Sequence, residues 1–549
     1  MNTLQANLVN AFKKEIYPVT IEFDKRVMKI EKIADSPDPA LPFLMPGFVD
    51  AHVHIESSML IPSEFARIAV THGTVATVSD PHEIANVCGV QGVHYMIDNG
   101  KRVPFKFNFG APSCVPATAF ETAGAVIDAE AIKELLILDD IKYLAEMMNF
   151  PGVLNKDPEV LKKIKYAKDL HKPVDGHAPG LRGEQAAAYI QAGISTDHEC
   201  FTRQEALDKL QHNMKILIRE GSAAKNFEAL IDLLNDHEDE MMFCSDDKHP
   251  DSLVEGHIDR LCARAVQKGV DIFKVVKAAC INPVFHYKLE VGLLRVNEPA
   301  DFILVNNLKD FKVLKTFIDG QLVAENGQTN IAGVSEKALN NFAVKEIKLK
   351  DLRLEKDTHL LDDEGQLPVI EAYDGQLITG KVLWAPKEDP KDPDAWVSDP
   401  QSDILKIVVV NRYHEAKPAM AFIKGFGIKK GAIASTVAHD SHNIVAVGVH
   451  DQDIMEAINV LVKEKGGISI SEQGKTQVLP LPVAGLMSNQ DGFEVAKNYG
   501  ALDNMAKKLQ SSLSAPYMTL SFMALLVIPA LKLSDKGLFD GERFEFVNQ

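Results

Sequence analysis

Eight segments between residues 46 and 290 share one pattern: a short β-branched or aromatic run leads into polar residues and then into a helical pattern. Strands that alternate with helices favour a parallel sheet, because each helix carries the chain back to the start of the next strand. Eight such units predict a (β/α)8 barrel of the α/β class. The runs are GFVDAHVH, TVATVSDPHE, FKFNFGAPSCV, YLAEMM, KPVDGHAPG, GISTDHEC, MKILIREGS and MMFCSDDKHP.

The segments on either side of the predicted barrel follow other patterns. Residues 1–45 and 291–345 read as short strands separated by turn residues, and we expect them to combine into one small β-sandwich. Residues 346–400 include EDPKDPDAW, whose Pro and Asp content favours a loop, so we expect a connecting region there. Residues 401–549 contain both strand and helix patterns, which predict a separate mixed α/β domain.

Charge and cysteine content restrict the partners and the compartment. The chain has 59 Lys+Arg against 77 Asp+Glu, and its formal net charge of -18 argues against binding to nucleic acid. The apolar run MTLSFMALLVIPAL is too short to span a bilayer, so we expect no membrane association. The 6 cysteines form no CxxC pair, which indicates free thiols in a reducing compartment. We therefore expect a cytoplasmic protein and, from its size, a homo-oligomer.

Polar side chains stand at the carboxyl end of several predicted strands. Barrel enzymes place their chemistry at this end, so side chains far apart in sequence converge there. Residues i and i+2 of a strand point to the same face, so His52 and His54 both point into the barrel mouth. The converging residues are His52, His54, Glu146, His177, His198 and Asp246.

These six residues predict a metal centre. An HxH pair alone can be solvated or can bond to the backbone, but imidazoles together with carboxylates suit Zn, Mn or Fe. Without a metal, the barrel mouth would bury unpaired polar groups at about 1 to 3 kcal/mol each. The assignment gives one ion His52, His54 and Asp246, the other ion His177 and His198, and both ions a bridging Glu146. Two divalent ions about 3.5 to 4 Å apart can ionise water over an electrophilic carbon, which predicts a hydrolase.

The same residues resemble the amidohydrolase superfamily, whose barrels carry HxH on the first strand, histidines on the fifth and sixth, and Asp on the eighth. More narrowly, PGFVDAHVHIESSML, DPHEIANV, LAEMMNFPGV, DGHAPGL, IREGSAAKN, SDDKHP, EGHIDRL, AHDSHNIVAVG, LPLPVAGLMS and VIPALKLSDKGLFDG resemble the bacterial adenine deaminase family. The resemblance extends from about residue 7 to 545. It implies an amidohydrolase barrel that converts adenine and water into hypoxanthine and ammonia in purine salvage. It also implies two divalent ions per chain, Mn or Fe, with Zn as a further option, and a glutamate on the fourth strand, here Glu146, as their bridge.

Catalytic roles follow as hypotheses from this reaction. Asp246 would accept the proton of the attacking water and later return it toward the departing amine. Ring nitrogen N1 must gain a proton as C6 becomes tetrahedral, and Glu83 or His82 of DPHE is the candidate donor. The alternative for DPHE is a helix cap formed by Asp80 before Pro81, and the two interpretations are compatible.

Five further residues are candidates for contact with the substrate: Glu56, Ser57, Ser58, Arg219 and Ser222. The first three follow the HxH pair and either line the pocket or cap the next helix. Arg219 either contacts the purine edge or pairs with a carboxylate. Asp247 is most simply a partner that orients a ligand histidine.

Residues 439–443 in the C-terminal segment form another polar group, with His439, Asp440 and His442. Three interpretations stay open for it: a separate metal site, a loop that reaches and closes the barrel mouth, or a hydrogen-bonded turn between two strands. Two functional alternatives also stay open. One is a deaminase or cyclic amidohydrolase acting on another heterocycle, because metal ligands do not define the substrate. The other is a non-catalytic barrel scaffold, which would be expected to lose ligands that this chain retains.

Overall fold

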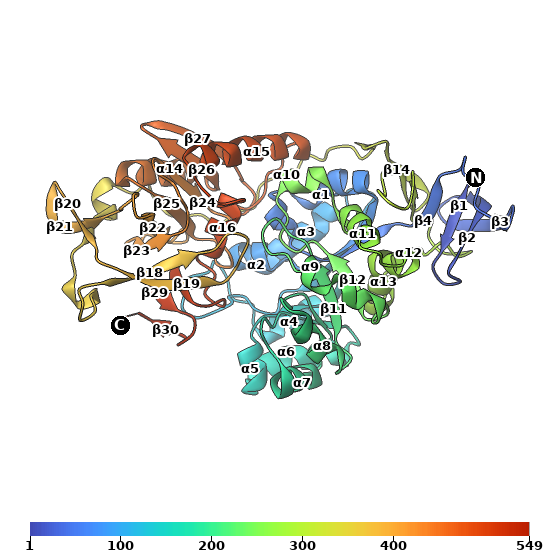
Figure 1. Cartoon of the computed structure of the whole chain (residues 1–549), viewed down its shortest axis with the longest axis horizontal. Helices are drawn as coiled ribbons and strands as arrows, with labels where there is room; N and C mark the ends of the chain where they lie inside the picture. The colour runs from blue at the N-terminus through green and yellow to red at the C-terminus, as the bar shows by residue number, and fades with distance from the viewer. Residues whose placement is uncertain (548–549) are drawn as a thin grey trace.

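Eight parallel strands occupy the middle of the molecule, and the computed structural model describes residues 1–547 around them (Figure 1). Strands β5 to β9 form one sheet in chain order, and β10 to β12 form another. Their bounds are β5 (Phe48–Val53), β6 (Thr74–Ser79), β7 (Lys106–Ala111), β8 (Ile141–Met147), β9 (Val174–Gly176), β10 (Thr196–Asp197), β11 (Lys215–Arg219) and β12 (Met241–Cys244).

Backbone hydrogen bonds join these two sheets at both edges. Between β9 and β10, the Ser195 N–H donates to the Val174 carbonyl over 2.9 Å. Between β12 and β5, the Asp246 N–H donates to the His52 carbonyl over 2.9 Å, and the His54 N–H donates to the Asp246 carbonyl over 3.2 Å. The strands thus close on themselves, and the predicted (β/α)8 barrel is confirmed.

Helices follow the barrel strands and cover them. α6 shows how the sequence starts one: the Asp157 side chain accepts hydrogen bonds from the N–H groups of Glu159 and Val160, and Pro158 takes the first position. The helices are α1 (Pro62–Ala69), α2 (His82–Cys88), α3 (Val90–Gly100), α4 (Ala129–Ile137), α5 (Phe150–Leu154), α6 (Pro158–Asp169), α7 (Gly183–Ala192), α8 (Arg203–Leu210), α9 (Phe227–Leu230), α10 (Pro250–Glu255), α11 (Ile258–Gln267), α12 (Ile272–Val276) and α13 (Asn282–Tyr287).

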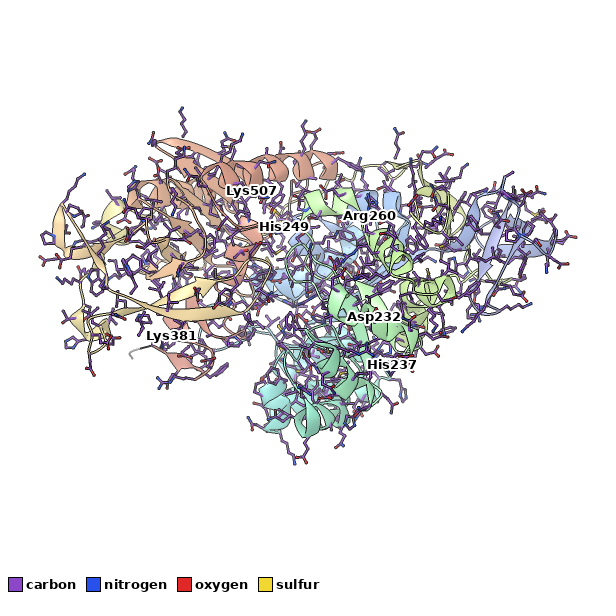
Figure 2. The ribbon with its side chains drawn as sticks, in the orientation of Figure 1. Asp232, His237, His249, Arg260, Lys381 and Lys507 are labelled. Atoms are coloured by element: carbon purple, nitrogen blue, oxygen red, sulfur yellow. The ribbon has the colours of Figure 1, made fainter. Side chains whose placement is uncertain are left out.

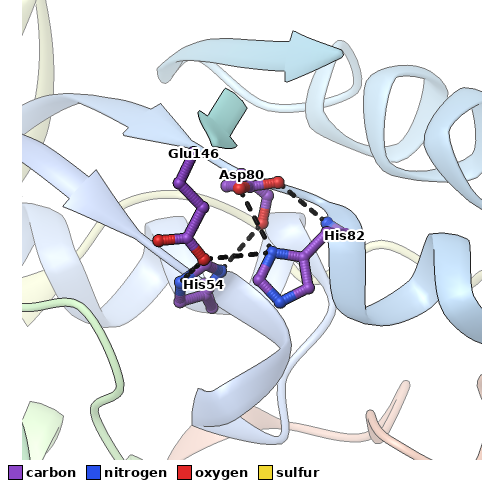
Figure 3. A group of neighbouring side chains, drawn as sticks. All are labelled: His54, Asp80, His82 and Glu146. Atoms are coloured by element: carbon purple, nitrogen blue, oxygen red, sulfur yellow. Dashed lines mark hydrogen bonds and ion pairs between the residues drawn. The ribbon is translucent and has the colours of Figure 1, made fainter. Parts of the chain in front are cut away.

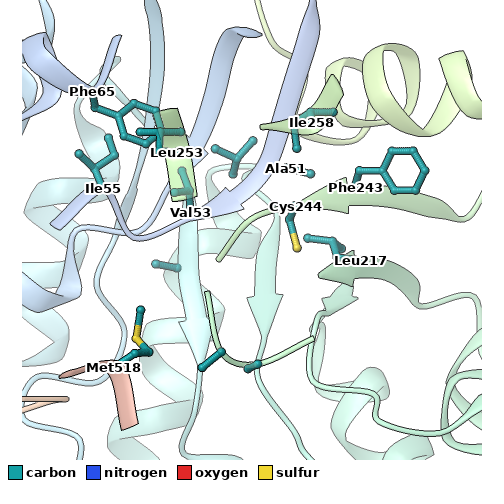
Figure 4. Close-up of a cluster of buried hydrophobic side chains, with 14 of the residues drawn as sticks. Ala51, Val53, Ile55, Phe65, Leu217, Phe243, Cys244, Leu253, Ile258 and Met518 are labelled. Carbon is teal, nitrogen blue, oxygen red and sulfur yellow. The ribbon is translucent and has the colours of Figure 1, made fainter. Parts of the chain in front are cut away.

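Apolar side chains fill the space between the barrel strands and their surroundings (Figure 4). Val53 of β5, Leu217 of β11 and Phe243 of β12 belong to one buried cluster with Phe65 of α1. Met518, from the C-terminal part of the chain, is buried in the same cluster. The C-terminal part therefore shares a hydrophobic core with the barrel.

The two flanks of the barrel segment meet in a single eight-stranded sheet, at the right of Figure 1. Strand β4 links them, because it pairs in parallel with β1 and antiparallel with β13. The sheet contains, in chain order, β1 (Asn2–Asn10), β2 (Glu15–Phe23), β3 (Val27–Lys32), β4 (Phe43–Pro46), β13 (Phe302–Val305), β14 (Val313–Ile318), β15 (Gln321–Glu325) and β16 (Gln328–Thr329). The rings of Phe23 and Phe302 pack edge to face within it, 5.0 Å apart.

A second eight-stranded sheet forms the C-terminal part, at the left of Figure 1. Its strands are β18 (Leu367–Ala372), β19 (Thr379–Trp384), β22 (Ile404–Val410), β23 (Ala419–Lys424), β24 (Ala432–Ser435), β25 (Ile444–Gly448), β26 (Gly467–Glu472) and β27 (Lys475–Pro480). Three helices accompany it: α14 (Asp451–Glu464), α15 (Gly492–Lys508) and α16 (Pro516–Phe522). A small sheet of β28 (Leu531–Ser534), β29 (Gly537–Asp540) and β30 (Glu545–Phe546) follows.

The expectation of a loop at EDPKDPDAW was wrong. This stretch forms the hairpin of β20 (Lys387–Asp389) and β21 (Asp392–Val397), which pairs further with β17 (Leu354–Glu355). Pro393 is tolerated because it lies at an irregularity of the ladder. It stands between Asp392 and Trp396, the residues of β21 that pair with Asp389 and Glu388 of β20. Trp396 is buried and anchors the hairpin.

The barrel and the C-terminal part also meet through polar side chains. His249 of the barrel segment, labelled in Figure 2, is one of them. Its Nδ1 atom contacts the hydroxyl of Tyr499 on α15, in the C-terminal part. Both side chains are buried. Within residues 1–547, every helix is too short or too polar to cross a lipid bilayer.

Candidate metal centre and active site

Glu146, at the end of β8, lies at the centre of the barrel mouth. Its Oε2 atom is 3.1 Å from His177 Nδ1 and 3.1 Å from His198 Nε2. The same carboxylate lies 3.7 Å from His52 Nε2 and 3.5 Å from His54 Nε2. One buried carboxylate thus contacts the histidines of both predicted groups.

Asp246, just after β12, faces the HxH pair. Its Oδ1 atom is 3.4 Å from His52 Nε2 and 3.2 Å from His54 Nε2, and these two nitrogens are 3.2 Å apart. All three side chains are buried. Ligand atoms that face one point at such spacings, imidazole together with carboxylate, fit a divalent transition metal. The six residues predicted as ligands come together in the structure, and divalent metal binding follows from this donor set.

Electrostatics keep both carboxylates ionised, as metal ligands must be. Burial alone would raise the pKa of Glu146, but His177 and the other imidazoles hold it well below the usual range. Burial would also raise the pKa of Asp246, but Arg219 and hydrogen bonds from His52 and His54 hold it well below the usual range.

Figure 3 shows a further group at the same mouth, in which His82 and Asp80 join His54 and Glu146. His82 Nδ1 lies 3.1 Å from Asp80 Oδ2 and 3.4 Å from Glu146 Oε1. Asp80 also accepts a hydrogen bond from the His82 backbone N–H over 3.0 Å, but α2 begins after Pro81 without a side-chain cap, so the expected cap by Asp80 is not formed. His82 therefore stands beside the predicted ligands, and its side chain is oriented by Asp80.

Sequence reasoning missed Glu199. Its Oε1 atom lies 3.5 Å from His198 Nε2 and 3.6 Å from His177 Nδ1, and the side chain is buried. The signal was available, because a carboxylate directly follows His198 in the polar end of the run GISTDHEC.

Arg219, at the end of β11, pairs with two carboxylates. Its guanidinium contacts both Glu199 and Asp246, and a second bond to Glu199 measures 3.1 Å. Of the two interpretations offered for this residue, pairing with a carboxylate is the one that the structure displays. Arg219 also borders the cavity described below.

The loop 439–443, between β24 and β25, reaches the barrel mouth. His439 Nδ1 contacts one oxygen of Glu83 and His442 Nε2 contacts the other. Burial alone would raise the pKa of Glu83, but His439, His442 and His82 hold it well below the usual range. Burial alone would lower the pKa of His439, but carboxylates, Glu83 first, raise it to about 9. The loop thus reaches the mouth, as the second interpretation expects. It is also a hydrogen-bonded turn between β24 and β25, because the His442 N–H donates to the Ala438 carbonyl over 2.8 Å. A separate metal site stays a prediction, since Asp440 groups with His82 and Glu83.

A buried cavity separates the metal-ligand group from this loop. Its barrel side is formed by ligand residues, His82, Glu83 and Arg219. Its other side comes from the C-terminal part of the chain: Leu377, His439, Asp440, Phe522 and Leu525. The mouth therefore has a polar floor, and its wall combines the apolar Leu377, Phe522 and Leu525 with two polar side chains.

Four of the residues predicted to contact substrate are not among those that line this cavity. Ser58 donates to the Ile55 carbonyl over 2.6 Å, and Ser57 donates to Asp247. Glu56 accepts from the Ile84 N–H over 3.1 Å, and burial raises its pKa to about 7. Ser222 accepts from the His249 N–H over 2.8 Å. Their substrate contacts stay predictions.

Two family models match the chain. The Amidohydrolase family model matches residues 43–323, and the Adenine deaminase C-terminal domain model matches residues 376–545. The adenine deaminase of Sulfurovum sp. (strain NBC37-1) is 55% identical over 547 residues, which cover 99% of each chain. The chain belongs to the adenine deaminase family. Further relatives are the adenine deaminases of Salinibacter ruber, at 52% identity over 100% of this chain and 98% of that one, and of Methanosarcina mazei, at 52% over 98% and 96%.

The residues that line the cavity come from both family matches. The ligand residues fall in the Amidohydrolase family match. The residues of the apolar wall, together with His439 and His442, fall in the Adenine deaminase C-terminal domain match. The C-terminal domain therefore contributes directly to the candidate active site.

Proposed function

We propose that this member of the adenine deaminase family hydrolyses adenine to hypoxanthine and ammonia, with two divalent ions, Mn or Fe, at the Glu146 centre. The observation that carries the proposal is one cavity that has the predicted metal ligands and the Glu83 carboxylate on its barrel side, and Leu377, Phe522 and Leu525 on the other side. Water and a flat base can meet there, because both sets of groups face the same space.

Six residues would hold the ions: His52, His54, Glu146, His177, His198 and Asp246. Bound divalent ions would lower the pKa of a water molecule and provide a nucleophile at neutral pH. Glu146 suits the bridging position because its two oxygens contact histidines of both groups.

Asp246 is the proposed general base. Its ionised carboxylate stands beside His52 and His54, and Arg219 fixes its second oxygen. It accepts the proton of water as the new bond to C6 forms, and it delivers that proton to the exocyclic nitrogen as the bond from C6 to nitrogen breaks. Ammonia leaves, and the second water proton passes from the C6 oxygen to the group that protonated N1, so the ring retains a C6 carbonyl and the enzyme regains its proton.

Glu83 or His82 is the proposed proton donor to ring nitrogen N1. His82 Nε2 lies 3.3 Å from Glu83 Oε1, so the two can share a proton at the cavity wall. His439 contacts the same oxygen from the other side. Because the imidazoles keep Glu83 ionised, the proton that Glu83 would pass to the ring is one that it first takes from His82 or His439.

The first experiment is turnover. Mn-loaded protein is incubated with adenine while ammonia and hypoxanthine are followed together, with a Glu146→Gln variant and metal analysis beside it. Equal amounts of both products from the parent, and their loss in the variant, support the proposal. If adenine is untouched while metal is bound, the purine assignment fails, and a panel of aminopyrimidines and cyclic amides then tests the heterocycle alternative.

Two properties of the whole protein extend the proposal. All six cysteines are free, and five of them are buried, which supports a reducing compartment such as the cytoplasm. A homo-oligomer is proposed from chain size alone and is tested by light scattering on a sizing column.

A further inference from the structure

Lys532 is a fully buried lysine that bonds only to main-chain carbonyls. It lies in β28, and its Nζ donates to the Leu377 carbonyl over 2.6 Å and to the Phe522 carbonyl over 2.9 Å. Burial lowers its pKa to about 7, and no carboxylate within residues 1–547 forms an ion pair with it. Two other buried lysines differ in this respect, since Lys406 pairs with Asp451 and Lys209 with Asp197.

The two carbonyls belong to the wall of the candidate active site. Leu377 and Phe522 both line the cavity, together with Leu525. These residues come from separate segments, the turn before β19 and the end of α16. Lys532 is the side chain that bonds to both segments at once.

The Phe522 ring connects this wall to the polar side of the cavity. It stacks on His439 with ring centroids 5.3 Å apart and an angle of 29° between the rings. His439 in turn contacts Glu83. A shift of the Phe522 segment would therefore displace both the apolar surface and a partner of the proposed proton donor.

We propose that Lys532 is a positioning residue for the base-binding wall, holding the Leu377 and Phe522 segments at the separation that admits a flat purine. The inference rests on the proposed function for its substrate. An uncharged lysine amine still has two N–H groups, enough for one bond to each carbonyl, so the link holds with or without the extra proton. Other bonds also tie the two segments to β28, since the Leu533 N–H donates to the Met523 carbonyl over 3.0 Å and the Thr379 hydroxyl donates to the Leu531 carbonyl over 2.7 Å. Lys532 is the side chain of β28 that adds a bond to each segment.

The test compares Lys532→Met with Lys532→Gln. Methionine has similar length and no donor, whereas the glutamine amide keeps two N–H groups on a shorter side chain. Both variants lack charge, so their difference isolates the hydrogen bonds. Lys406→Met is the control, because it also removes a buried lysine of the C-terminal part, from β22, and Lys406 bonds to no residue that lines the cavity.

Two measurements are made on the metal-loaded full-length enzyme. The first is hydrogen–deuterium exchange of peptides that contain residues 377–379 and 522–525, which needs no substrate. The second is the KM and kcat for adenine. Loss of two hydrogen bonds is expected to raise exchange in both peptides and to raise KM about tenfold with kcat within about threefold, in Lys532→Met but not in Lys406→Met. Lys532→Gln is expected to lie between Lys532→Met and the parent.

Each result decides something. Unchanged exchange in Lys532→Met, or equal KM in the Met and Gln variants, overturns the positioning role. If Lys532→Met does not fold, Lys532→Leu, which also lacks a donor, takes its place, and unchanged exchange or an unchanged KM in that variant overturns the positioning role. Raised exchange with an unchanged KM in Lys532→Met would show that Lys532 stabilises the fold without positioning the base-binding wall, and it also overturns the proposal. If the parent itself does not turn over adenine, the proposed function fails, and the exchange data still decide whether Lys532 holds the wall.

Discussion

His442 and Glu83 are in direct contact, although 359 residues separate them in the chain. The other oxygen of Glu83 contacts His439, so the C-terminal part supplies both imidazoles that hold this carboxylate. The proposed proton donor is thus a barrel residue whose orientation is set by another domain.

Replacement of His442 by Gln is expected to slow adenine turnover about 10- to 100-fold, because Glu83 loses the contact that fixes one oxygen. The metal content is expected to stay unchanged, since His442 contacts none of the six predicted ligands. Steady-state kinetics and metal analysis check both points. The control is His450→Gln, a change at an exposed histidine of the same domain. A wild-type kcat in the His442 variant would show that the contact between His442 and Glu83 is not needed for turnover.

Replacement of Asp246 by Asn is expected to lower kcat about 10²- to 10⁴-fold, the usual effect of losing a general base. Asparagine keeps the shape and can still face His52 and His54. The measurement pairs turnover with metal analysis of the same sample. A near-wild-type rate with the metals still bound would show that another group accepts the proton.

Replacement of Glu146 by Gln is expected to weaken metal binding and to lower the thermal midpoint of metal-loaded protein. The carboxylate contacts histidines of both groups, and its charge favours ions in both positions. A bound ligand stabilises the folded state more as the ratio of its concentration to its Kd rises, with a logarithmic dependence. Weaker metal binding therefore gives a smaller rise of the thermal midpoint when metal is added. Thermal scans with and without added Mn measure that shift. A variant that keeps the full shift would argue against the bridging position.

His249 is expected to make the fold sensitive to acid. Burial, and to a lesser degree His439, lowers its pKa from 6.5 to about 3, so the folded chain holds this imidazole neutral. The unfolded chain binds a proton below pH 6.5, and stability is therefore lost as the pH falls from 6.5 toward 3. Between pH 7.5 and 5.5 the loss from this residue is about 1.4 kcal/mol.

Denaturant unfolding at these two pH values checks the prediction. His249→Gln cannot titrate and is expected to lose about 1.4 kcal/mol less than the parent over this interval, whatever its absolute stability. His212→Gln, at an exposed position, serves as control and is expected to keep the parental pH dependence. An identical dependence in all three proteins would contradict the neutral buried state of His249.

The barrel and the convergence of the six residues predicted as ligands could be read from the sequence because their signals are local. Each strand carries its own apolar run, and each ligand stands where that run ends, as with Asp246 after MMFC. Glu199 was missed although the same rule applies to it. Its role becomes visible only once Arg219 is seen to connect it with Asp246.

Contacts between distant segments could not be predicted in this way. Nothing in AHDSHN indicates that Glu83 is its partner, because the pairing depends on how the C-terminal sheet docks on the barrel. The partners of Ser57 and Ser58 were not predictable either, since these hydroxyls beside the HxH pair bond to Asp247 and to a local carbonyl. At EDPKDPDAW the Pro and Asp residues favour a turn, but burial of the Trp396 side chain stabilises a strand there.

The position of the loop 439–443 has a consequence for the order in which the protein is made. A ribosome completes the barrel strands and all six predicted ligands before it reaches this loop, and it adds Phe522 and Lys532 near the end. During synthesis the barrel mouth is therefore open to water and to ions, and about the last fifth of the chain, from this loop onward, closes it. Metal can load into a nascent chain that does not yet have a complete pocket for a base.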